Sequence, residues 1–153
     1  MAMMKWTMAA LAILVGAGVA FAAATGADAI KDRRALMKAN GDATKPIVPM
    51  LQGKAPFDLA TMQKALHTYQ DAAQKMPDLF PPDSKTGGET HALPAIWEDD
   101  NLADVKARFE KLGKDAAAAL VSVKDDASFK AIMPDFFKNN CGGCHEKYRE
   151  RQQ

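Results

Sequence analysis

The strongest chemical pattern in the chain is the run Cys141-Gly142-Gly143-Cys144-His145 near the C-terminus. Two thiols three residues apart fall on one side of a helical turn, where they can add to the two vinyl groups of a haem, and the adjacent histidine can reach the iron. A thioredoxin-like redox pair would need a strand-to-helix junction, and a zinc site would need two further ligands. The run therefore predicts one covalent haem c, attached through Cys141 and Cys144, with His145 as the proximal axial ligand of the iron.

The composition limits the class of protein. The chain has 153 residues, with 20 Lys+Arg against 19 Asp+Glu and only two cysteines. That length corresponds to one domain, and a charge balance this near zero gives no electrostatic footprint for nucleic acid. Two cysteines are too few for a disulfide framework, so a chemical role for them is favoured over a structural one.

Residues 1–24 have the pattern of a cleavable secretory signal peptide. A basic Lys5 precedes an apolar run that ends in a small-x-small cleavage pattern at 20–22. An uncleaved membrane anchor is the alternative, but two glycines interrupt the run. No other apolar run is long enough to cross a bilayer. We therefore expect an exported, periplasmic protein whose mature form, residues 25–153, does not span a membrane.

The mature chain is predicted to form four amphipathic helices. Apolar residues recur at helical spacing over about 28–52, 58–76, 94–121 and from 126 to the end of the chain, with no convincing strand alternation. Asp58 is expected to cap the second helix, and Asp126 or Ser128 the fourth. Pro46 and Pro49 predict a kink in the first helix, and Pro134 a bend or the true start of the fourth. The stretch 77–91, rich in proline and glycine, is predicted to be the one long loop. Helices of comparable length with mostly short links favour an all-α, antiparallel up-down-up-down four-helix bundle, with the haem near the C-terminal helix.

An exported four-helix chain with C-x-x-C-H near its C-terminus resembles the cytochrome c′ family, the class II c-type cytochromes. The resemblance covers essentially the whole mature chain and includes Tyr148-Arg149 after the haem motif, the turn at 53–58, and Arg33 four residues before Met37. It implies an electron-transfer protein rather than an enzyme. High-spin members of the family have an empty or blocked distal face. Low-spin members, resembling cytochrome c-556, use a methionine of the first helix as the sixth ligand.

Met37 distinguishes these two kinds. At 1.5 Å per residue, Met37 and His145 both lie roughly 12 Å from the same end of the predicted bundle. The other candidates lie near the opposite end, on the histidine's own helix, at a helix terminus or in the loop: Met50, Met62, Met133, Met76 and His91. The residues around Met37 also resemble those of the methionine-ligated members. We predict Met37 as the distal axial ligand, and one-electron transfer through low-spin His/Met iron.

Two other readings of the site stay open. In the first, Met37 is a plain core methionine and the protein is a five-coordinate cytochrome c′ that binds NO or CO. A peroxidase-type haem enzyme is less favoured because no distal His/Arg pair is evident.

Two arginines are expected in the haem pocket. The resemblance implies that Arg33 pairs with a haem propionate; solvent exposure, with Arg34 in its place, is the alternative. Arg149 faces the same side of the helix as His145, and the resemblance puts it beside that histidine, with a solvated tail residue as the alternative. Redox partner proteins are expected, and nucleic acid is not. Whether the faces of the first two helices pair two subunits into a homodimer, as often happens in this family, is left open.

Overall fold

The computed structural model describes residues 25–151, so the predicted signal peptide, residues 1–24, lies outside the described part of the chain. The α-helices are α1 (Gly26–Thr44), α2 (Ile47–Leu51), α3 (Leu59–Lys75), α4 (Asn101–Ser122), α5 (Asp126–Phe137) and α6 (Gly143–Tyr148). Short 3₁₀ helices lie at η1 (Met76–Asp78), η2 (Pro82–Ser84) and η3 (Pro94–Trp97), and η4 (Lys138–Gly142) is a π-helix.

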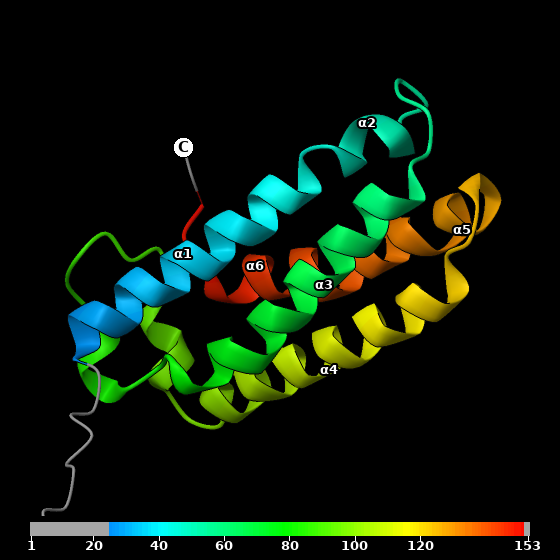
Figure 1. The fold of residues 1–153 in the computed structure, drawn as a ribbon. Helices are drawn as coiled ribbons and strands as arrows, with labels where there is room; N and C mark the ends of the chain where they lie inside the picture. The colour runs from blue at the N-terminus through cyan, green and yellow to red at the C-terminus, as the bar shows by residue number, and fades with distance from the viewer. Residues whose placement is uncertain (1–24, 152–153) are drawn as a thin grey trace, which may run out of the picture.

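These helices form the predicted bundle. α3 packs against α1 and α4, and α4 packs against α5 and η4. Figure 1 shows α1, α3, α4 and the α5–η4–α6 run alternating in direction. The expected all-α, antiparallel up-down-up-down four-helix bundle is therefore confirmed. No helix among residues 25–151 combines the length and apolarity that crossing a bilayer requires.

The first helix is divided rather than kinked. α1 ends at Thr44, and α2 begins at Ile47, just after Pro46. Proline has no backbone N–H, so it cannot continue the hydrogen bonding of the preceding helix. The single helix predicted over 28–52 was therefore wrong at this point. Gly53 follows α2 with a φ of 68°, and its amide donates to the carbonyl of Met50 at 3.1 Å.

The caps of α3 and α5 are carboxylates. Asp58 accepts a hydrogen bond from the amide of Thr61 at 2.6 Å, as predicted for the start of the second long helix. Asp125 accepts from the amide of Ser128 at 2.8 Å and is the cap of α5. The prediction of Asp126 or Ser128 as the cap was wrong, because Ser128 is the reciprocal partner in the capping box rather than the cap itself.

The last helix changes its geometry four residues later than predicted. Pro134 lies inside α5, and the departure from α-helix begins at Lys138, where the π-helix η4 starts. Asn140 explains part of this change, because its side-chain amide donates to the Phe136 carbonyl at 3.1 Å and to Asp115 at 2.8 Å. A side chain that takes a helix carbonyl competes with the backbone for it. The π-helix contains Cys141, whereas Cys144 lies in α6.

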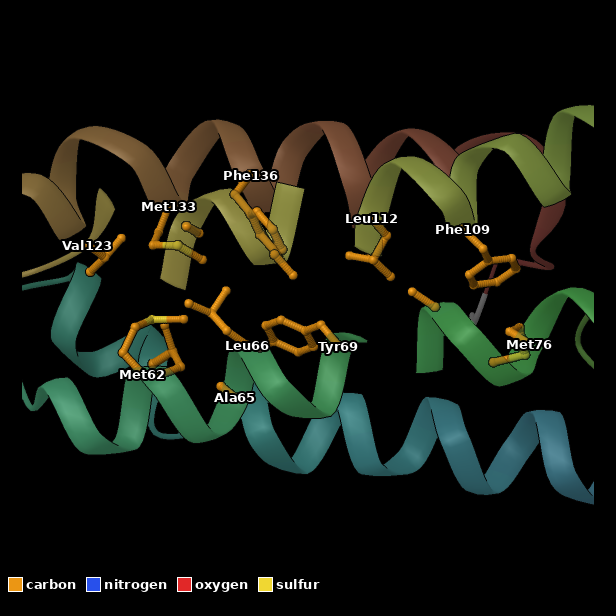
Figure 2. Packing of buried hydrophobic residues seen from close by; sticks show 14 of the residues in the cluster. Met62, Ala65, Leu66, Tyr69, Met76, Phe109, Leu112, Val123, Met133 and Phe136 are labelled. Carbon is orange, nitrogen blue, oxygen red and sulfur yellow. The ribbon is translucent and has the colours of Figure 1, made fainter. Parts of the chain in front are cut away.

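The core fills the space between α3, α4 and α5. Figure 2 shows Met62, Leu66 and Tyr69 of α3 facing Met133 and Phe136 of the last helix. The rings of Tyr69 and Phe136 lie 5.8 Å apart. Burying each such side chain stabilises the fold by about 1.5–3 kcal/mol. This packing holds α3 against the part of the chain that leads into the cysteine motif.

The segment between α3 and α4 is longer and more ordered than a plain loop. It includes η1 and η2, and η3 stands apart from α4, which begins at Asn101 rather than near residue 94. The loop predicted over 77–91 therefore continues to residue 100, with short helical turns inside it. Its one β-like contact is an isolated antiparallel bridge between Ala92 and Arg149.

Candidate functional site

The two cysteines are half-buried free thiols in a low-polarity environment. Burial raises the pKa of Cys141 to about 11, and the neighbouring Cys144 adds to the rise. Burial also raises the pKa of Cys144, although the positive charge of Arg108 works against it. A catalytic redox thiol needs a lowered pKa, so this environment disfavours the thioredoxin-like alternative.

A hydrogen-bonded cluster around Asp104 holds α6 against α4. The buried Tyr148 hydroxyl donates to Asp104 Oδ2 at 2.5 Å, and Arg108 Nε and Lys147 Nζ donate to the same oxygen at 3.0 and 3.2 Å. These bonds, with that from Tyr148 first, lower the pKa of Asp104 to about 2. The cluster fixes the rotation of the short helix that carries His145. Sequence reasoning placed Tyr148 on the buried face but missed its partners on α4, because they lie 44 residues away in the chain.

One face of α1 carries four polar or sulfur-bearing side chains at helical spacing: Arg33, Met37, Asn40 and Thr44. Arg33 is buried and Met37 is half-buried. The Oδ1 atom of Asn40 is buried without a hydrogen-bond partner. The other methionines among residues 25–151 are buried core residues, namely Met50, Met62, Met76 and Met133. Met37 is thus the one methionine among residues 25–151 that is not buried.

Tyr69 of α3 joins the end of this face to the cysteine motif. Thr44 Oγ1 and the Tyr69 hydroxyl lie 2.7 Å apart in a hydrogen bond. Burial raises the pKa of Tyr69 to about 12; the bond to Thr44 opposes the rise, and the charge of nearby Cys141 adds to it. Thr44 and Cys141 therefore both lie near Tyr69 of α3.

A second connection lies at the other end of the same face. Arg33 holds the α3–α4 segment, in which Ala92 pairs with Arg149. The α1 segment 33–44, about 16 Å long, therefore runs antiparallel to segment 141–149, about 12 Å long. Met37 lies in the first of these segments and His145 in the second.

Arg149 lies next to His145. Its backbone amide donates to the His145 carbonyl at 3.2 Å. His145 is exposed as a residue, yet the surrounding atoms displace enough water from its ring to lower its pKa, and the charge of Arg149 lowers the pKa further. The role of Arg149 in a haem pocket stays a prediction, with a solvated tail residue as the alternative.

Arg33 is buried, so the alternative prediction of a solvent-exposed Arg33 is wrong. Its side chain is 6% exposed and donates to the carbonyl and hydroxyl oxygens of Ser84 at 3.0 and 2.7 Å. Arg34 is the exposed neighbour and pairs with Glu89 at 2.5 Å. The pairing of Arg33 with a haem propionate stays a prediction.

These residues fit a haem c. Residues 140–144 are all half-buried, and the Oδ1 atoms of both Asn40 and Asn140 are buried without partners. Met37 is likewise half-buried, whereas the core between α3, α4 and α5 is packed. The two thiols, the imidazole of His145 and the thioether of Met37 are side-chain types that can attach a haem and ligate its iron.

A four-helix bundle with C-x-x-C-H in its last helix defines the class II c-type cytochromes. The family model described as cytochrome C′ matches residues 28–149. A cytochrome c′ of Rhodopseudomonas palustris is 46% identical over 149 residues, which span 97% of this chain and 99% of that protein. A cytochrome c-556 of Agrobacterium fabrum is 36% identical over 149 residues, spanning 95% and 97%.

The solved structure of the cytochrome c′ from Rhodopseudomonas palustris has the same fold. It superimposes with a TM-score of 0.77 at 47% identity, covering 82% of this chain and 98% of that one. The chain therefore belongs to the cytochrome c′ family. Its members are covalent haem c proteins that transfer electrons or bind gases; they are typically periplasmic and often dimeric.

Proposed function

We propose that this protein is a periplasmic one-electron carrier whose haem is attached through Cys141 and Cys144, with His145 and Met37 as the axial ligands of a low-spin iron. The observation that supports the proposal is that Met37 is half-buried and one helical turn after the buried Arg33 on α1, whereas the other methionines among residues 25–151 are buried in the core. Bound haem c would supply the one-electron redox chemistry, and a thioether ligand favours the ferrous state. The chain's own contribution is to fill both axial positions, which excludes substrates and gases from the iron.

The pocket arginines are part of the same proposal. Burial lowers the pKa of His145, and the positive charge of Arg149 lowers it further, so both disfavour protonation of the imidazole. A neutral imidazole is the form that ligates a metal. Arg33 would carry its positive charge to the same end of the bundle, one helical turn from Met37, where it can pair with a propionate.

The proposed periplasmic location depends on residues 1–24, which would direct export as a signal peptide and then be cleaved. The basic residue, the apolar run and the small-x-small pattern at the N-terminus support this location, and members of the family are typically periplasmic. Redox proteins of the same compartment are the expected partners.

A five-coordinate cytochrome c′ that binds NO or CO is the second candidate. It is favoured by one observation: the Rhodopseudomonas palustris relative with 46% identity is named cytochrome c′, whereas the Agrobacterium fabrum relative named cytochrome c-556 has 36%. In that case Met37 would be a core side chain and the distal face would be open to small gases.

The absorption spectrum of the ferrous protein separates the two candidates. We expect sharp, split low-spin bands that CO leaves unchanged. Met37→Leu keeps the side-chain volume but removes the sulfur, so it should give a broad high-spin spectrum that shifts with CO.

A matched control exchanges Leu36 and Met37 in one variant, which keeps the composition but turns the thioether about 100° around the helix. This variant should behave like Met37→Leu. A wild-type spectrum that is high-spin and responds to CO would contradict the electron-carrier proposal and favour the gas-binding one.

A further inference from the structure

Arg33 is a buried cation that holds the segment between α3 and α4. Its Nη1 donates to the Leu79 carbonyl and to Ser84 Oγ at 2.7 Å, and its Nη2 donates to the Ser84 carbonyl at 3.0 Å and to Thr90 Oγ1 at 3.5 Å. Every one of these partners is neutral. The planar, forked guanidinium therefore holds the segment through several hydrogen bonds to neutral oxygens, and not through an ion pair with a carboxylate.

Aromatic rings complete the surroundings of this guanidinium. Its central carbon lies 4.9 Å from the ring centre of Phe80 and 5.5 Å from that of Trp97. The indole nitrogen of Trp97 donates in turn to the carbonyl of Phe80 at 3.1 Å. The rings offset part of the cost of burying a charge, so Arg33 is stable where it lies.

The same segment is fastened to the C-terminal part of the chain. The amide of Leu93 donates to the Tyr148 carbonyl at 2.9 Å, and the amide of Glu150 donates to the His91 carbonyl at 2.8 Å. Residues 79–93, called here the bridging loop, thus contact α1 at Arg33 on one side. On the other side they contact residues 148–150, which lie three to five positions after His145.

We infer that Arg33 is a positioning residue, which through the bridging loop sets the separation between the part of α1 that carries Met37 and the part of the chain that carries His145. The inference rests on the proposed function, in which those two side chains are the axial ligands. Ligand groups must be held within about 0.5 Å of their working geometry. α1 and α6 do not pack closely on one another: α1 packs on α3 and η2, whereas α6 packs on η4 and is bonded to α4 through Asp104.

Arg33→Lys tests the inference in the haem-loaded protein. Lysine keeps the positive charge, so any role that depends on charge alone persists, but it lacks the fork that reaches several loop oxygens. We expect hydrogen exchange at the amides of Leu93 and Glu150 to become about tenfold faster, and CO binding to the ferrous protein to increase about tenfold. Arg34→Lys, at the exposed neighbour, is the matched control and should behave as wild type.

A milder variant covers the case in which Arg33→Lys does not fold. Thr90→Val removes the hydroxyl that accepts from Arg33 Nη2 and from the amide of Ala92 at 3.2 Å. It should change both readouts in the same direction by a smaller factor.

The two readouts keep the inference separate from the proposed function. A wild-type protein that already binds CO contradicts the proposed ligation by Met37, but amide exchange still shows whether Arg33 ties the bridging loop to the C-terminal segment. Unchanged exchange at Leu93 and Glu150 in Arg33→Lys overturns the inference. The inference is also overturned if exchange in Arg33→Lys becomes faster but CO binding stays as weak as in a low-spin wild type. The bridging loop would then not control ligand geometry.

Discussion

Tyr148→Phe removes one hydroxyl from the contact between α6 and α4. That hydroxyl donates to Asp104 Oδ2 at 2.5 Å and lies 3.0 Å from Asn101 Oδ1, and Tyr148 is 3% exposed. A hydrogen bond to a charged group contributes about 1.5–3 kcal/mol. Asp104 keeps its bonds to Arg108 and Lys147, and 36% of its side chain is exposed, so solvent screening reduces the value. We expect the free energy of unfolding to fall by about 1–2 kcal/mol at neutral pH.

The size of this loss should depend on pH. The bond from Tyr148 is the first cause that lowers the pKa of Asp104 from 3.8 to about 2. A lowered carboxyl pKa stabilises the fold above the unfolded-state pKa, and this contribution is lost as the pH falls through the folded-state value. Without the hydroxyl, the folded-state pKa of Asp104 moves back toward 3.8, so the wild type loses more stability on acidification than the variant. The difference between the two proteins should be constant above about pH 5 and shrink between about pH 4 and pH 2.

Urea unfolding of the haem-loaded proteins, followed by circular dichroism at constant ionic strength, measures this difference. Asp42→Asn is the control. The pKa of Asp42 is also lowered to about 2, by Lys38 and Lys45, but the group is exposed and its removal should change stability too little to measure. A Tyr148→Phe protein as stable as wild type at neutral pH would refute the reasoning. So would a stability difference that stays the same down to about pH 2.5.

Four further substitutions, in two pairs, test how α1 is held. Gly26→Ala should destabilise the fold by about 1–3 kcal/mol, because an added Cβ would overlap the Asp83 carbonyl. Gly41→Ala, where an added Cβ meets no atom, should stabilise it by about 0.5–1 kcal/mol in thermal melts; equal melting temperatures for the two variants would contradict this. Tyr69→Phe and Thr44→Val should each cost about 0.5–1.5 kcal/mol, with the double variant no worse than the more damaging single one. Fully additive losses in urea unfolding would show that the two hydroxyls act separately.

Much of the fold was predictable because its signals are local. Asp58 caps α3 as its residue type and position indicate, and the helical spacing of Met62, Leu66 and Tyr69 identifies the buried face of that helix. The errors occurred where a local rule met competing contacts. Pro134 is accommodated inside α5, whereas the side chain of Asn140 takes a helix carbonyl and the helix changes at η4 instead.

The candidate site divides along the same line. The haem motif and Met37 could be chosen from residue types, spacing and distance along helices. The surroundings of Arg33 could not, because its partners lie 46 to 57 residues away in a segment without periodicity. The unusual signal was a buried-face arginine with no acidic residue one helical turn away, which requires partners from elsewhere in the chain.

The sequence by itself determined the class of protein. The C-x-x-C-H motif and the four amphipathic helices before it are both recognised from the spacing of residues along the chain. Only the tertiary structure decided which methionine among residues 25–151 stays half-buried, which carboxylate holds α6, and which loop joins α1 to the residues after His145. Those properties depend on contacts between segments far apart in the chain. Burial of the apolar faces of α3, α4 and α5 fixes how these helices pack. The packing in turn determines which hydrogen bonds the polar side chains at their edges can form.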